Sequence, residues 1–128
     1  MLKTLMAVMM LTLTLPFAAR AEDRVVELWT CTLLDGKTLD DAKAVNGKWL
    51  KLQNSANPGA GIRSWGLTSI VGQPGSFMYL DSFPSLEAWS KSRAAIATPA
   101  GVAVDAELNA TAECASNSLH EAIEHGTE

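Results

Sequence analysis

The feature that most constrains the fold is a pair of cysteines, Cys31 and Cys114, that lie far apart in the sequence. They are the only cysteines among 128 residues. In an oxidising compartment such a pair favours a disulfide, which would bring the start and the end of the domain together. The alternatives are a redox-active pair, which usually has C-x-x-C spacing, and free or metal-bound thiols, which would favour further ligands nearby. We therefore expect a structural disulfide.

The N-terminal residues indicate an oxidising compartment. Lys3 precedes an apolar run over residues 5–15, and Pro16 and the small residues at positions 19 and 21 follow. This is the pattern of a secretory signal peptide that is cleaved after residue 21. The run is also shorter than the ~20 apolar residues that span a bilayer. We expect a periplasmic or secreted protein with no membrane segment after cleavage, in which residues 22–128 form a single domain.

The charge of the chain excludes one class of partner. The formal net charge is −4, and loss of residues 1–21 removes two basic residues and makes the remaining chain more acidic. Nucleic-acid backbones attract basic surfaces, so we expect no nucleic-acid partner.

Hydrophobic spacing and turn residues define the order of elements. Residues 25–34 are β-branched and aromatic, and helical spacing follows Thr38, which is a favourable N-cap. Proline is favoured at the first position of a helix, so Pro99 starts another one. The predicted elements are a strand at 25–34, a helix at 39–55, strands at 62–71 and 76–83 around a QPG turn, helices at 86–97 and 99–109, and a strand at 110–119. The tail, 120–128, is expected to be frayed or a short helix.

This order predicts an α+β fold of the ferredoxin-like type, β-α-β-β-α-β, with a four-stranded antiparallel sheet and helices on one face. In that topology the first strand lies between the third and the fourth. Cys31 and Cys114 would then lie on neighbouring strands, which agrees with a disulfide between them.

Helices on one face leave the other face of the sheet open. The alternation of side chains places residues of a strand on two faces in turn. Each strand therefore has two sets of side chains, one on each face. When the set of smaller aliphatic side chains of each strand is assigned to the helix side, the sets with bulky aromatic and charged side chains lie together on the open face. Such a group suits a subunit interface or a small-ligand cavity. The candidate ligand-binding residues are Glu27, Trp29, Arg63, Trp65, Tyr79 and Asp81.

The element order resembles the dimeric α/β-barrel superfamily, in which two ferredoxin-like subunits pack sheet to sheet and enclose a pocket. Its members include cofactor-independent antibiotic-biosynthesis-type monooxygenases, stress-responsive barrel proteins and haem-binding enzymes. The segments CTLLDGKT and DSFPSLEAW also resemble a group of short exported bacterial proteins of unknown function. The resemblance implies a homodimer. It transfers no catalytic residue, because no catalytic motif of the superfamily matches this sequence.

Other candidate chemistry is weaker. His120 and His125 in HEAIEH are five residues apart, so they do not share a helix face as the zinc motif H-E-x-x-H requires. Trp49 and Trp89 fall on apolar helix faces and are expected in the core. We predict no metal and no cofactor.

The sequence thus predicts a homodimeric binding or interaction module with a small-ligand cavity on the open sheet face. The alternatives are a cofactor-independent monooxygenase-like enzyme or isomerase in the same cavity, and a purely structural exported protein. Whether the protein is an enzyme stays open at this point.

Overall fold

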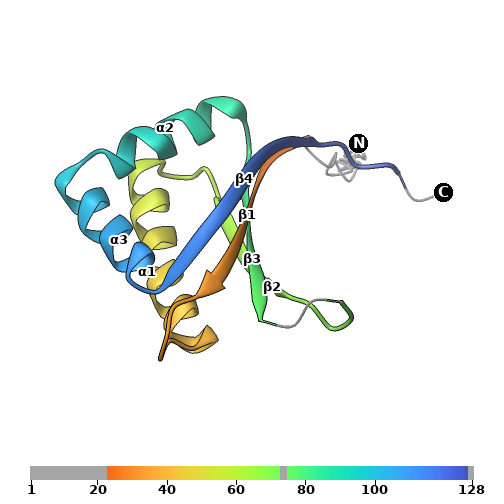
Figure 1. The fold of residues 1–128 in the computed structure, drawn as a ribbon. Coiled ribbons are helices and arrows are strands. Elements are labelled where there is room, and N and C mark those ends of the chain that lie inside the picture. The colour runs from red at the N-terminus through yellow and green to blue at the C-terminus, as the bar shows by residue number, and fades with distance from the viewer. Residues whose placement is uncertain (1–22, 73–74, 127–128) are drawn as a thin grey trace, which may run out of the picture.

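The computed structural model describes residues 23–72 and 75–126 (Figure 1). The predicted signal peptide, 1–21, and part of the predicted QPG turn lie outside the described residues. The elements are β1 (Arg24–Leu33), α1 (Leu39–Ala56), β2 (Arg63–Thr68), β3 (Ser76–Phe83), α2 (Leu86–Ile96), α3 (Pro99–Asn109) and β4 (Ala112–Ala122). In this part of the chain no helix has both the length and the apolar character needed to cross a membrane.

The four strands form one antiparallel sheet in the order β2-β3-β1-β4. All three helices lie on one side of this sheet, and the other side carries no helix (Figure 1). The predicted α+β, ferredoxin-like arrangement is therefore confirmed, including the position of the first strand between the third and the fourth.

A disulfide joins β1 to β4, as the sequence predicts. Cys31 and Cys114 are paired in the strand register, and their Sγ atoms are 2.02 Å apart. The register shifts next to this bond: Thr30 pairs with Ser116, so Ala115 has no partner on β1. An extra residue of this kind is a β-bulge. The disulfide therefore fixes β4 to β1 at the point where their regular pairing changes.

The helices begin where the sequence predicts, because each has a side-chain cap. The Thr38 hydroxyl accepts a hydrogen bond from the Asp41 amide, and the Asp41 carboxylate accepts one from the Thr38 amide. This reciprocal pair is a capping box. Ser85 caps α2, and Thr98 caps α3 with Pro99 at its first position.

Trp49 lies in the core as predicted, edge to face with Phe83 at a centroid distance of 6.5 Å. A second cluster of buried residues surrounds the disulfide and includes Phe77 and Tyr79. Trp89 is only partly buried, and its indole N–H donates a hydrogen bond into the site described below. Trp89 therefore packs against the core, as predicted, and in addition contributes a hydrogen-bond donor to the site.

Two strand ends differ from the prediction by three residues, and the other element boundaries agree within two residues. The second strand ends at Thr68, and Ile70 and Val71 are almost fully exposed in the connection to β3. The fourth strand runs on to Ala122, through the segment predicted as a frayed or helical tail. The reason is that β1 offers backbone partners along its whole length, down to the pairing of Arg24 with Ala122. His120 consequently lies on a strand, and no group of three or more His, Cys, Asp or Glu suited to a metal ion occurs in the described part of the chain.

Candidate functional site

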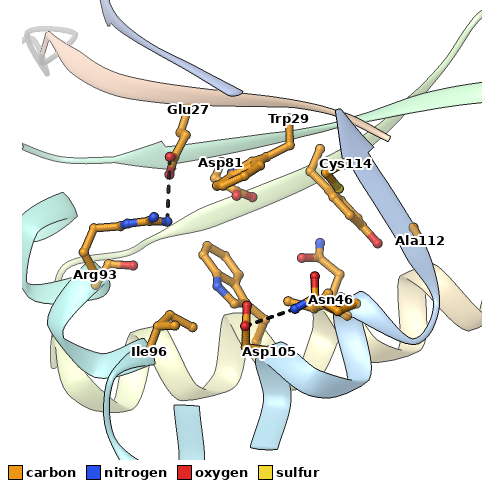
Figure 2. Close-up of a pocket in the computed structure, with 14 residues that line it drawn as sticks. Glu27, Trp29, Asn46, Asp81, Arg93, Ile96, Asp105, Ala112 and Cys114 are labelled. Carbon is orange, nitrogen blue, oxygen red and sulfur yellow. Dashed lines mark hydrogen bonds and ion pairs between the residues drawn. The ribbon is translucent and has the colours of Figure 1, made fainter. Parts of the chain in front are cut away.

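A cavity of about 280 Å³ lies between the sheet and the three helices (Figure 2). This volume is close to the lower end of the range found for small-molecule sites. The sheet contributes Glu27, Trp29, Tyr79, Asp81, Ala112 and Cys114 to its lining, and the helices contribute Asn46, Trp49, Ser92, Arg93, Ile96, Asp105, Leu108 and Asn109.

Four of the six candidate residues line this cavity, but they do so on the helix side of the sheet. Glu27 pairs with Asp81, and Trp29 pairs with Tyr79, across β1 and β3. Paired residues of an antiparallel sheet point to the same face. The exposed fractions of Glu27, Tyr79 and Asp81 are 2%, 8% and 4%, because the helices cover that face. Their predicted placement on the open face is wrong.

The two remaining candidates lie on the opposite face. Arg63 and Trp65 of β2 pair with Ser82 and Leu80 of β3, so their side chains share the face of Leu80 rather than that of Asp81. Both are exposed, and neither lines the cavity. The six candidates therefore do not form one group, and a ligand cavity on the open face is not supported by their positions.

The reason for the error is physical. Alternation states which residues of a strand share a face, and it correctly grouped Glu27 with Trp29, Tyr79 with Asp81, and Arg63 with Trp65. It does not state which face the helices cover. The helices here cover the aromatic sets of β1 and β3, because rings from those strands fill the space against α1. Tyr79, for example, donates a hydrogen bond from its hydroxyl to the Ala42 carbonyl at 3.2 Å.

Glu27 is held by donors from two elements. Its Oε2 accepts a hydrogen bond from Trp89 Nε1 at 3.1 Å, and its Oε1 accepts one from Asn117 Nδ2 at 3.0 Å. The guanidinium of Arg93 lies 3.9 Å from Oε1, beyond hydrogen-bond distance, and 5.7 Å from the centre of the Trp29 ring (Figure 2). Arg93 is thus placed at the cavity by a carboxylate and an aromatic face.

Asp81 has a different environment. Its Oδ1 accepts a hydrogen bond from Ser64 Oγ, and that hydroxyl accepts one from Asn46 Nδ2 at 2.8 Å. Burial raises the pKa of Asp81 from 3.8 to about 7; the Ser64 hydrogen bond opposes this shift, and the nearby charge of Glu27 adds to it. Asp81 therefore exchanges its proton near neutral pH, which is the property expected of a group that transfers protons or responds to a charged ligand.

Tyr79 stays protonated at neutral pH. Burial, together with the negative charge of Asp81, raises the pKa of its hydroxyl to about 12. The hydroxyl proton is already donated to the Ala42 carbonyl. Tyr79 consequently offers the cavity its ring rather than a reactive phenolate.

Sequence reasoning missed several polar residues of the site, chiefly Asn46, Ser64 and Arg93. A signal existed for two of them. Asn46 lies one helical turn before Trp49 on α1, and Arg93 lies four residues after Trp89 on α2. Residues spaced in this way share a helix face, so both were candidates for the same interior. Ser64 could not be found, because its role depends on the pairing of β2 with β3.

The α+β fold of this chain is shared with several solved structures. Solved structures with the same fold include SnoaB, a cofactor-independent oxygenase from Streptomyces nogalater, with 17% identity and a TM-score of 0.61 over 83% of this chain and 99% of that chain. A NIPSNAP family protein of unknown function from Agrobacterium tumefaciens has 20% identity and a TM-score of 0.56 over 79% and 89% of the two chains.

An uncharacterized NIPSNAP domain protein from Burkholderia xenovorans has 16% identity and a TM-score of 0.54 over 79% of this chain and 94% of that chain. No protein-family model and no curated protein matches the sequence. Identities this low establish the fold alone, so function has to be argued from the cavity.

Proposed function

We propose that this protein is an exported homodimeric module that binds a small organic molecule in the cavity between the sheet and the helices. One observation carries the proposal: a nearly buried carboxyl group, Asp81, lines a cavity that has aromatic rings in its walls. Small-molecule sites commonly combine apolar and aromatic walls with a few placed polar groups. Burial of a carboxyl group lowers stability unless it is compensated, and ligand recognition gives a reason to retain it.

A titration of the protein with a panel of small aromatic compounds, followed by two-dimensional NMR, tests this function. Binding should shift the backbone amides of residues that line the cavity. Leu108 lines the cavity from α3 and is half-buried, so Leu108→Trp should fill part of the space and suppress binding. Leu86→Trp, on an exposed position of α2 away from the cavity, is the matched control. Shifts confined to the open face, or no shifts with any compound, would contradict the proposal.

The homodimer is proposed through the open face of the sheet. That face carries apolar side chains on three strands, among them Leu28, Trp65, Met78 and Leu80, and the exposed fractions of Trp65 and Met78 are 44% and 38%. Apolar and aromatic surface of this kind is typical of subunit interfaces. The resemblance to dimeric α/β-barrel proteins supports the same conclusion.

Light scattering on Trp65→Glu should show a monomer where the unmodified protein is a dimer, because a charge would be buried in the interface. Val102→Glu, at an exposed position on α3, should leave the dimer intact.

Native mass spectrometry on protein recovered from the periplasm tests export: the chain should begin at Glu22. A chain that retains residues 1–21 would contradict export with cleavage.

A second function, catalysis without a cofactor, is favoured by one specific observation. The pKa of Asp81 is about 7, and general acid–base catalysis is most efficient when the pKa of the group is near the working pH. In an assay that detects turnover, Asp81→Asn should then lower kcat by about 100-fold or more. Unchanged turnover in this variant would leave binding as the function of the cavity.

A further inference from the structure

The charged groups of the cavity are unequally distributed. Three carboxyl groups line it, from Glu27, Asp81 and Asp105, against one cationic side chain, Arg93. Glu27 and Asp81 are almost fully buried, whereas the Arg93 side chain is 48% exposed and is nearest to Glu27. Among residues 23–72 and 75–126, no cationic side chain forms an ion pair with Asp81. The inner part of the cavity is therefore acidic.

One carboxylate oxygen of Asp81 is available to accept a hydrogen bond from a ligand. Its Oδ1 accepts from Ser64, and its Oδ2 takes no hydrogen bond from any described residue. The carboxyl group points into the cavity (Figure 2). An ionised carboxylate accepts several hydrogen bonds, so this oxygen can receive a charged N–H donor.

Aromatic rings lie beside these carboxyl groups. Trp29 and Tyr79 are neighbours on β1 and β3, and Trp49 lines the cavity from α1. The face of an aromatic ring attracts cations, most strongly when water is excluded. The protein already uses this combination once, because the Arg93 guanidinium lies over Trp29 and near Glu27.

We propose that the cavity selects a small organic cation, a protonated primary amine with an apolar body, whose ammonium group pairs with Asp81 and whose body lies against Trp29 and Tyr79. This inference rests on the proposed binding function and assigns the chemical class of the ligand. An anionic ligand would place its charge near two buried carboxyl groups, and only the half-exposed Arg93 could compensate it.

Binding of an ammonium group should change the protonation of Asp81. An ammonium group next to Asp81 favours the carboxylate, so binding should release the proton that Asp81 holds when its pKa is about 7. Affinity should then rise as the pH increases through about 7. The other ionisable groups that line this space are Glu27 on β1, Tyr79 on β3, Arg93 on α2 and Asp105 on α3. Tyr79, with its pKa raised to about 12, keeps its proton throughout this range.

Calorimetric titration with three compounds of matched shape tests the proposal: 2-phenylethylamine, 2-phenylethanol and phenylacetate. At neutral pH the amine should bind at least about tenfold more tightly than the alcohol, and phenylacetate should bind most weakly. Asp81→Asn should lower the affinity for the amine to that for the alcohol, and it should leave the affinity for the alcohol unchanged. Asp35→Asn, the same chemical change in an exposed turn, should leave all three affinities unaltered. Titration in buffers of different ionisation enthalpy should show proton release with the amine only.

The outcomes separate the ligand class from the function. If the alcohol or phenylacetate binds in the cavity as tightly as the amine, the cation assignment is wrong and the binding function stands. If none of the three binds while other compounds of the panel shift the cavity residues, the assignment is again wrong. If no compound of any kind binds in the cavity, both proposals fall.

Discussion

The most informative single change is Asp81→Asn, because its effect on stability should depend on pH in a defined direction. The carboxyl group has a pKa of about 7 in the folded protein and its usual value of 3.8 when exposed. Between these two values the folded state binds the proton and the unfolded state does not. The contribution of Asp81 to the free energy of unfolding should therefore fall as the pH rises from about 4 to about 7, and then level off.

The magnitude follows from the same two values. A shift of one pKa unit corresponds to about 1.4 kcal/mol. The rise in the pKa of Asp81 from 3.8 to about 7 therefore lowers the free energy of unfolding by about 4 kcal/mol above neutral pH. An asparagine at position 81 cannot ionise, and its side-chain oxygen can still accept the hydrogen bond from Ser64. The variant should thus match the unmodified protein near pH 4 and exceed its stability by up to about 4 kcal/mol near pH 8.

Urea unfolding followed by tryptophan fluorescence at several pH values measures this difference directly. Ionisable groups that do not interact with Asp81 contribute equally to both proteins and cancel. Asp35→Asn, the same chemical change in an exposed turn, is the matched control. If the difference in free energy of unfolding between Asp81→Asn and the unmodified protein is constant, or decreases as the pH rises, the assignment of a raised pKa to the buried carboxyl group is refuted.

Four further changes test other parts of the structure. Reduction of the Cys31–Cys114 bond, which links residues 83 positions apart, should lower the free energy of unfolding by roughly 4 to 5 kcal/mol in the chain-entropy model, and an unchanged urea midpoint with dithiothreitol would contradict this. Tyr79→Phe removes a buried hydroxyl that donates to the Ala42 carbonyl, so chemical unfolding should show a loss of about 1 kcal/mol; no loss would indicate that this hydrogen bond is not formed. Gly101→Ala would place a Cβ atom 2.5 Å from the Ile96 Cα and should destabilise the protein by about 1 to 3 kcal/mol. Gly47→Ala, in an open position within α1, should instead stabilise it by about 0.5 to 1 kcal/mol, and equal effects of the two alanines would refute the packing argument.

Local sequence signals were sufficient for most of the fold. The Thr38, Ser85 and Thr98 caps set the helix starts, and hydrophobic spacing set the element order from which the sheet topology follows. The disulfide between Cys31 and Cys114 was also predictable, because the predicted topology and the expected export to an oxidising compartment indicated it independently. These features depend on residues close in sequence or on general rules of chain topology.

The site depended on information that no local pattern contains. The alternation along β1 and β3 grouped Glu27 with Trp29 and Tyr79 with Asp81 correctly, but the packing of helices decided which face became the interior. The same holds for the raised pKa of Asp81, which arises from burial and from Glu27 on another strand. Periodicity is a property of one segment, whereas burial and electrostatic environment result from several segments packed together. The sequence by itself therefore determined the elements, their order and the covalent cross-link, and only the tertiary structure decided which side chains meet in the cavity.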